Sequence, residues 1–74
     1  MYIYKFMMRL IDELYENGFY SVDVFKEHIK DKNEILIRVI CKKDNKKYDY
    51  NYTLNEMLLD DISIQEIINN LLMK

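Results

Sequence analysis

The stretch Lys47-Tyr48-Asp49-Tyr50-Asn51-Tyr52-Thr53-Leu54 alternates between two kinds of side chain. The three tyrosines and Leu54 fall on one side, whereas the aspartate, the asparagine and the threonine fall on the other. Successive side chains of a β-strand point to opposite faces of a sheet, so a repeat of two residues is typical of a half-buried strand. The stretch therefore predicts a strand with an aromatic ladder on one face, which the rest of the chain must cover or leave for a partner.

The composition limits what such a chain can be. With 74 residues, of which 50% are hydrophobic and 32% charged, it predicts one folded domain. It has no proline and only one glycine, Gly18, which excludes a glycine-rich phosphate loop and favours short polar turns. The net charge of −2 is too small to indicate a partner. The charges are unevenly spread, however, because residues 26–47 contain eight Lys or Arg against four Asp or Glu, whereas residues 55–74 are acidic.

Cys41 is the single cysteine, so no intrachain disulfide is possible and a reducing, cytoplasmic setting is expected. It lies within an apolar run, and we interpret it as a small buried side chain and not as a nucleophile. Lys5, Arg9 and Asp12 interrupt the apolar residues of the N-terminal region. We therefore expect no signal peptide and no membrane-spanning segment.

Residues 2–16 predict an amphipathic helix, because apolar side chains recur at intervals of three and four residues. This stripe consists of Ile3, Phe6, Met7, Leu10, Ile11 and Leu14. Asn17-Gly18 follows the last residue of the stripe, and glycine is the residue that most readily adopts the left-handed conformation after a helix. We expect the helix to end there.

Two further strands are expected before the tyrosine stretch. In the first, over about residues 19–28, Tyr20, Val22 and Val24 alternate with Phe19, Ser21, Asp23 and Phe25. The second, from Glu34 to Lys42, has Ile35, Ile37, Val39 and Cys41 on one face and Leu36, Arg38 and Ile40 on the other, which predicts the central strand. Polar turns are expected at residues 30–33 and 43–46, where Asp44-Asn45 suits the positive φ angles of a tight hairpin.

The C-terminal region contains two helix-start signals. Thr53-Leu54-Asn55-Glu56 and Ser63-Ile64-Gln65-Glu66 both match the capping box. They predict a short helix near residues 54–60 and a second helix near residues 64–73, although one continuous helix over residues 54–73 also fits the apolar spacing. The second helix has Ile64, Ile67, Ile68, Leu71 and Leu72 as its stripe.

The expected fold is α+β, with the order αβββα or αβββαα in one domain of residues 1–74. The three strands are expected to form an antiparallel meander that packs with the helices as a two-layer sandwich. We expect both helices on the sheet face that holds the tyrosines, although the reverse assignment remains open. The opposite face would then be part apolar and open to a protein partner or a second copy of the chain. Its predicted partner-binding residues are Phe25, Leu36, Arg38, Ile40, Asp49 and Asn51.

No catalytic, cofactor or metal site is predicted. His28, the only histidine, has no ligands spaced to join it, and adjacent carboxylates such as Asp60-Asp61 diverge on a helix. A basic turn offers an alternative function, contact with the phosphates of a nucleic acid, through Lys42, Lys43, Lys46 and Lys47. The element order also matches the double-stranded-RNA-binding fold, but the lysine cluster that this fold carries at its last helix is missing here.

A series of short motifs resembles a small phage-borne anti-CRISPR protein of the Cas9-inhibitor type, over about residues 10–54. The motifs are Leu10-Ile11-Asp12-Glu13-Leu14, Tyr20-Ser21-Val22, Ile35-Leu36-Ile37-Arg38-Val39 and the tyrosine-containing strand. The resemblance implies a helix, three strands and one or two helices, in a protein that binds a nuclease effector and blocks its DNA-contacting surface through acidic side chains. The candidate acidic residues are Asp23, Glu27, Asp31, Glu34, Asp44 and Asp49.

Together, these patterns predict a non-catalytic, cytoplasmic protein that occupies the surface of a host nucleic-acid-processing or defence protein such as a CRISPR effector. A phage or mobile element is the expected origin. The alternatives are the nucleic-acid-binding module and a structural homodimer.

Overall fold

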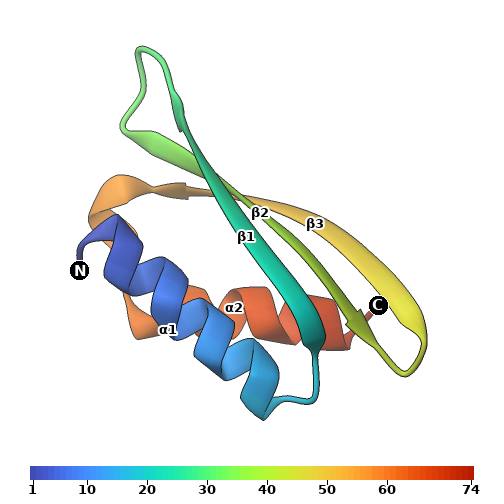
Figure 1. The fold of residues 1–74 in the computed structure, drawn as a ribbon. Helices are drawn as coiled ribbons and strands as arrows, with labels where there is room; N and C mark the ends of the chain where they lie inside the picture. The colour runs from blue at the N-terminus through green and yellow to red at the C-terminus, as the bar shows by residue number, and fades with distance from the viewer.

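The computed structural model describes residues 1–74 and has the predicted order of elements. A helix is followed by three strands, a single 3-10 turn and a second helix (Figure 1). The elements are α1 (Ile3–Glu16), β1 (Tyr20–Ile29), β2 (Glu34–Lys43), β3 (Lys46–Asn55), the 3-10 turn η1 (Glu56–Leu58) and α2 (Asp61–Leu72). The α+β fold is thereby confirmed. The C-terminal region contains a short 3-10 turn followed by a separate helix, and not one continuous helix.

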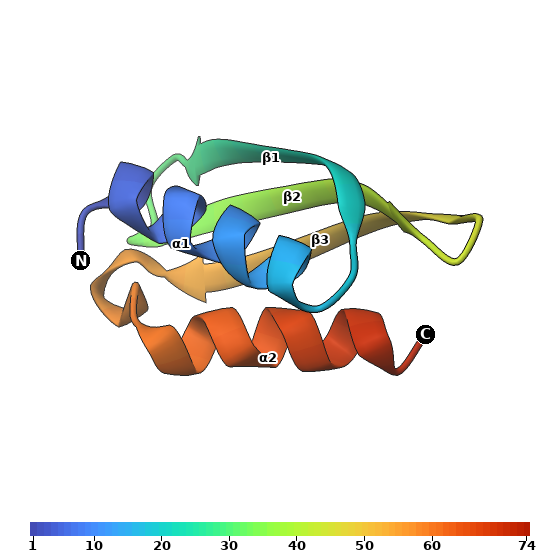
Figure 2. The same ribbon diagram turned by 60° about the horizontal axis from the view of Figure 1, so that its bottom comes forward.

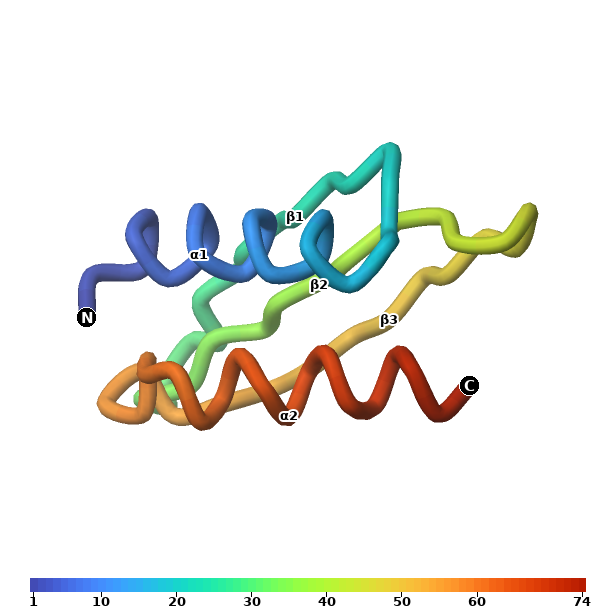
Figure 3. Tube along the Cα trace, turned by 90° about the horizontal axis from the view of Figure 1, so that it is seen from below, coloured from blue at the N-terminus to red at the C-terminus, as the bar shows by residue number.

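The three strands form one antiparallel sheet in the order β1-β2-β3, and both helices lie on the same face of it (Figure 2). The helices run side by side in the same direction, so that both of their C-terminal ends lie toward the β2–β3 hairpin (Figure 3). The central strand β2 pairs along its whole length with β3, for example Ile37 with Tyr52 and Val39 with Tyr50. Paired residues share a face, so this register places the tyrosines beside the apolar residues of β2.

A single core lies between the sheet and the helices. Its 14 buried side chains are Phe6, Leu10, Leu14, Phe19, Ile35, Ile37, Val39, Cys41, Leu54, Leu59, Ile64, Ile67, Ile68 and Leu71. The three tyrosines of β3 are partly buried and pack against this core, as do Val22 and Val24 of β1. The expected placement of the tyrosine ladder on the helix-covered face is confirmed, and the reverse assignment of the two faces is wrong.

The end of α1 is a Schellman motif. The amide of Phe19 donates to the carbonyl of Leu14 and the amide of Gly18 donates to that of Tyr15, at 3.0 and 3.1 Å. These two bonds satisfy carbonyls that the end of the helix would otherwise leave unpaired, and they require a left-handed residue. Gly18 supplies it with a φ of +89°. The predicted helix end is confirmed, and the motif directs Phe19 into the core.

A β-bulge in β1 corrects the predicted faces of that strand. Tyr20 pairs with Lys42 and Asp23 pairs with Ile40, so Ser21 and Val22 together lie opposite one residue of β2. Ser21 occupies the bulge with a φ of +52°. The extra residue reverses the alternation, which places Tyr20 on the face opposite the helices and the preceding Phe19 in the core. The predicted grouping of Tyr20 with Val22 and Val24 was wrong for this reason.

The β2–β3 hairpin has a two-residue turn, as predicted. Lys43 pairs with Lys46, and the intervening Asp44 and Asn45 have φ angles of +52° and +67°. Two consecutive positive φ angles twist the chain in the sense that antiparallel strands need. The turn thereby fixes the register of the tyrosine strand against β2.

The helix caps differ from the predicted capping boxes. The amide of Met57 donates to the Asn55 side chain at the start of η1, and the amide of Ser63 donates to the Asp60 carboxylate at the start of α2. Ser63 lies inside α2, where its hydroxyl donates to the carbonyl of Leu58 at 2.7 Å. Asparagine and aspartate cap helices as well as serine does, so several polar residues near a helix start compete for the position and the pattern alone does not decide between them.

The left-handed conformation of Ser21 in the bulge decides whether a substitution there raises or lowers the free energy of unfolding. Ser21→Val should lower the free energy of unfolding by roughly 1–2 kcal/mol, because a β-branched side chain is unfavourable at positive φ. Ser21→Gly should leave it unchanged or raise it by up to about 1 kcal/mol. Urea unfolding followed by circular dichroism measures both changes. In a regular strand the order would reverse, because valine favours and glycine disfavours extended strands.

Candidate functional site

The sheet face that the helices leave uncovered, called the outer face, carries all six predicted partner-binding residues. In the strand register Phe25 lies beside Arg38, which lies beside Asn51, and Ile40 lies beside Asp49. Leu36 lies two residues from Arg38 on the same face of β2. The structure brings these residues together, while their binding role remains a prediction.

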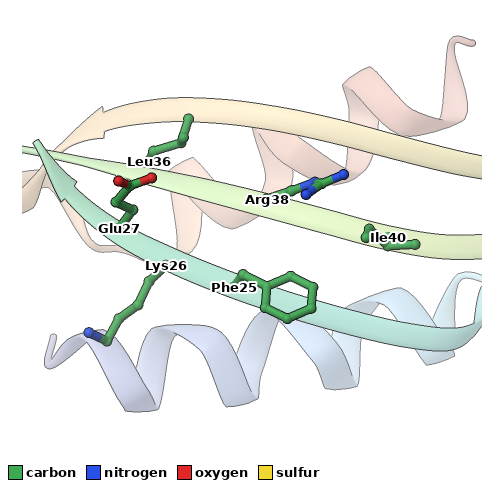
Figure 4. Close-up of a pocket in the computed structure, with 6 residues that line it drawn as sticks. All are labelled: Phe25, Lys26, Glu27, Leu36, Arg38 and Ile40. Atoms are coloured by element: carbon green, nitrogen blue, oxygen red, sulfur yellow. The ribbon is translucent and has the colours of Figure 1, made fainter.

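An open depression of about 320 Å³ lies on the outer face. Its apolar lining is Phe25, Leu36 and Ile40, and Phe25 is 51% exposed although it is a large aromatic residue. Arg38 and Glu27 add polar groups to the lining (Figure 4). Exposed apolar side chains with charged neighbours form the kind of surface that proteins use to contact other proteins.

An ion pair crosses this face from β2 to β3. Arg38 donates from Nε to Asp49 Oδ1 at 3.0 Å and from Nη2 to Asp49 Oδ2 at 2.6 Å. The hydrogen bonds to Arg38 hold the pKa of the Asp49 carboxyl below its usual value, and those to Asp49 raise the pKa of the guanidinium. Both groups are therefore charged at neutral pH and hold each other in a fixed, two-bonded geometry.

The remaining charges divide the outer face into acidic and basic regions. Asp23 and Glu27 of β1 lie beside Ile40 and Leu36, whereas Lys42 and Lys47 face one another next to the β2–β3 turn. The acidic residues that the anti-CRISPR resemblance implies do not form one row. Asp31 and Asp44 lie in turns at opposite ends of the sheet, and Asp49 is neutralised by Arg38.

The structure splits the four lysines predicted for nucleic-acid contact. The Lys43 ammonium donates to the carbonyl of Asn17 at 2.8 Å and lies 5.1 Å from the centre of the Phe19 ring, so it caps the end of α1. Lys46 pairs with Lys43 across the turn, and both line a depression of about 280 Å³ that also includes Lys74. Lys42 and Lys47 remain on the outer face. Strand alternation therefore places two of the four lysines on each face of the hairpin, and their contact with a nucleic acid remains a prediction.

Polar contacts fasten α2 to the tyrosine strand. The Tyr52 hydroxyl is hydrogen-bonded to the Glu66 carboxylate, and Asn70 Nδ2 donates to the Tyr50 hydroxyl at 3.0 Å. The Lys74 ammonium lies 4.4 Å from the centre of the Tyr50 ring. The sequence patterns predicted the face of these tyrosines but not the partners of their hydroxyls. The four-residue spacing of Glu66, Asn70 and Lys74 was the available signal, since it places them on one side of a helix.

The remaining chemically reactive residues are dispersed. His28 has a side chain that is 59% exposed, and its Nδ1 lies 3.8 Å from Glu56 Oε2. Cys41 is fully buried, and this burial raises the pKa of its thiol. No group of three or more His, Cys, Asp or Glu side chains is placed to hold a metal ion. Neither helix has the length and the apolar run that crossing a bilayer requires.

No family model, curated protein or solved structure matches this chain. The outer face is therefore defined by the geometry of this chain alone. The resemblance to anti-CRISPR inhibitors remains a prediction.

The contact between Tyr52 and α2 predicts a pKa change. Glu66→Gln should lower the pKa of the Tyr52 hydroxyl from about 12 toward its ordinary value of 10.0, because the hydrogen bond to the carboxylate is the main reason for the shift. The chemical shift of Tyr52 Cζ, followed by NMR as a function of pH, measures this. The pKa of Tyr52 is higher in the folded protein than the ordinary value of 10.0. The contribution of its hydrogen bond with Glu66 to the stability of the fold is therefore complete below pH 10.0 and is lost as the pH rises toward about 12.

The matched control for this titration is Asn70→Ala. It removes the partner of the neighbouring Tyr50 hydroxyl and should leave the shift of the Tyr52 pKa in place. A Tyr52 pKa that stayed near 12 in the Glu66→Gln variant would contradict the pairing of α2 with this tyrosine.

Proposed function

We propose that this chain is a non-catalytic binding protein that docks the outer face of its sheet on another protein. The observation that supports the proposal is the uncovered apolar group of Phe25, Leu36 and Ile40 beside a fixed ion pair. Removing these apolar side chains from water favours association. The Arg38–Asp49 pair is already formed and costs little further ordering on binding, since the two groups hold each other in place.

The charges suggest the chemistry of the partner surface. An apolar side chain of the partner would enter the depression between Phe25, Leu36 and Ile40. Basic groups would lie over Asp23 and Glu27 on one side of it, and acidic groups over Lys42 and Lys47 on the other. Such a pattern favours one orientation of the partner, because the reversed orientation would place like charges together.

The partner class that the resemblance implies is a nuclease effector of the Cas9 type in a bacterial cytoplasm, and a phage or mobile element would be the source of the inhibitor. In this proposal, inhibition comes from occupying a surface of the effector through apolar contact. Imitation of DNA by a row of acidic groups is not part of it, because Asp49 is paired with Arg38 and the other acids are scattered.

Binding to a purified Cas9-type nuclease tests the proposal. Leu36→Asp should weaken binding at least 30-fold, which corresponds to roughly 2 kcal/mol, the threshold for a residue that dominates an interface. Met57→Asp, a matched change at an apolar residue that is 84% exposed in η1, should leave the dissociation constant within about threefold, since surface changes away from an interface have small effects. Calorimetry or biolayer interferometry measures both dissociation constants.

Two outcomes would contradict the proposal. One is binding that survives Leu36→Asp, which would exclude the outer face. The other is binding of a labelled oligonucleotide that falls steeply with salt and is lost in the Lys42→Glu, Lys46→Glu double variant, which would favour the nucleic-acid module instead. Circular dichroism of each variant confirms that the chain is folded.

A further inference from the structure

The solvent side of α1 carries a second apolar stripe that the core does not use. It consists of Tyr4, Met8, the half-buried Ile11 and Tyr15, called here the α1 exposed stripe. Tyr4 and Met8 are each 67% exposed, and Tyr15 is 52% exposed. The core residues Phe6 and Leu10 of the same helix are fully buried. The helix is therefore apolar on two sides, of which the protein covers only one.

The exposed stripe has the spacing of a helix–helix interface. Its residues are four, three and four positions apart, which is the spacing of the a and d positions of a coiled coil. The stripe is bordered on the β1 side by Lys26, whose ammonium lies 5.4 Å from the centre of the Tyr4 ring. On the α2 side it is bordered by charged residues, of which Arg9 is paired with Asp61 of α2 at 2.8 Å.

We propose that the exposed stripe of α1 binds the same stripe of a second copy of this chain, with the two helices antiparallel. In this arrangement Met8 packs beside Ile11 of the second copy, and Tyr4 packs beside its Tyr15. Tyr4 and Ile11 occupy the d positions of this pattern. Lys5 and Asp12 directly follow them, on the side of the stripe that carries the charged border. In an antiparallel pair, Lys5 of each copy then lies next to Asp12 of the other.

Charge complementarity selects this orientation and this occupant. The exposed charged border carries Lys5 in its N-terminal half and Asp12 and Glu16 in its C-terminal half. An antiparallel second copy therefore brings opposite charges together twice by symmetry, and it also aligns the helix dipoles favourably. A parallel copy would place like charges at the same height along the pair, which is unfavourable.

The dimer leaves the proposed docking surface free. The exposed stripe lies on the helix layer, and the outer face lies on the opposite side of the sheet (Figure 2). A dimer through α1 therefore presents two outer faces at once. This consequence rests on the proposed function, whereas the dimer itself does not. A two-sided binder gains apparent affinity when both of its faces can be engaged together.

Sedimentation equilibrium of the full chain over a range of micromolar to millimolar concentrations tests the dimer. The mass should rise with concentration from 9.1 kDa to twice that value. Met8→Glu should raise the dimer dissociation constant at least tenfold, because it places a charge in the centre of the stripe. The matched control Met57→Glu changes an exposed methionine outside the stripe and should leave the dissociation constant unchanged.

A charge exchange tests the antiparallel register. Lys5→Glu should weaken the dimer, and Lys5→Glu combined with Asp12→Lys should restore it. In a parallel pair these two positions lie about 10 Å apart along the axis, so the double change would restore nothing. Since both residues are exposed, circular dichroism should show an unchanged fold in each variant.

Three results would overturn the proposal. They are a monomeric mass at every concentration, a dimer that is indifferent to Met8→Glu, and a charge exchange without restoration. A dimer that resists Met8→Glu but is lost in Leu36→Asp would place the second copy on the outer face. That result would overturn the helix dimer and would compete with the proposed docking function, whereas failure of the helix dimer alone leaves that function standing.

Discussion

Two helices side by side can cover only one face of a three-stranded sheet, and the rest of the structure follows from this limit. The helices are amphipathic, and each must bury its apolar side to be stable in water. The sheet face with Ile35, Ile37 and Val39 offers the largest apolar area, so both helices pack there. No helix of residues 1–74 lies on the opposite face. The exposure of Phe25 is a direct result.

The tyrosines of β3 allow an edge strand to pack against the core and still meet water. β3 is an edge strand, and its inner side must be apolar near the core and polar near water. A tyrosine meets both needs, since its ring packs and its hydroxyl forms hydrogen bonds. Tyr50 and Tyr52 accordingly contact the core with their rings and α2 with their hydroxyls.

The basic β2–β3 hairpin has a structural role that composition alone does not reveal. Both helices end near this hairpin, and neither has a basic residue in its last turn. The carbonyl groups at a helix end carry partial negative charge, and a nearby cation stabilises them. Lys43 supplies that cation to α1 from the neighbouring hairpin, where it contacts Asn17 and Phe19. Part of the charge that suggested a nucleic acid thus serves the fold.

Much of this fold could be predicted from local patterns. The alternation along β2 and β3, the position of Gly18 and the Asp44-Asn45 turn each depend on a few neighbouring residues, and all three agree with the structure. The bulge at Ser21 could not be predicted, because serine carries no sign of a left-handed conformation and the bulge is defined only by the pairing with β2. The choice of Asp60 over Ser63 as a cap also depends on where the preceding turn ends.

For the candidate site, the residues of the outer face could be listed from alternation alone, because both strands that supply most of them are regular there. The bidentate geometry between Arg38 and Asp49 could not, since these residues are diagonal neighbours whose contact depends on the register and twist of the sheet. The exposed stripe of α1 was overlooked because the core stripe of the same helix accounts for its amphipathic pattern. A heptad count along residues 4–15 would have found it.

The bulge in β1 also bears on how this chain avoids aggregation. A small sheet has two edge strands whose unpaired backbone groups can recruit strands from other molecules. In β1 the positive φ of Ser21 interrupts the regular spacing of those groups and limits the regular part of this edge to Asp23–Ile29. In β3 the charged side chains of Lys46, Lys47 and Asp49 occupy one end of the strand. A bulge on one edge and charged side chains on the other are two of the features by which proteins oppose the addition of further strands to a sheet.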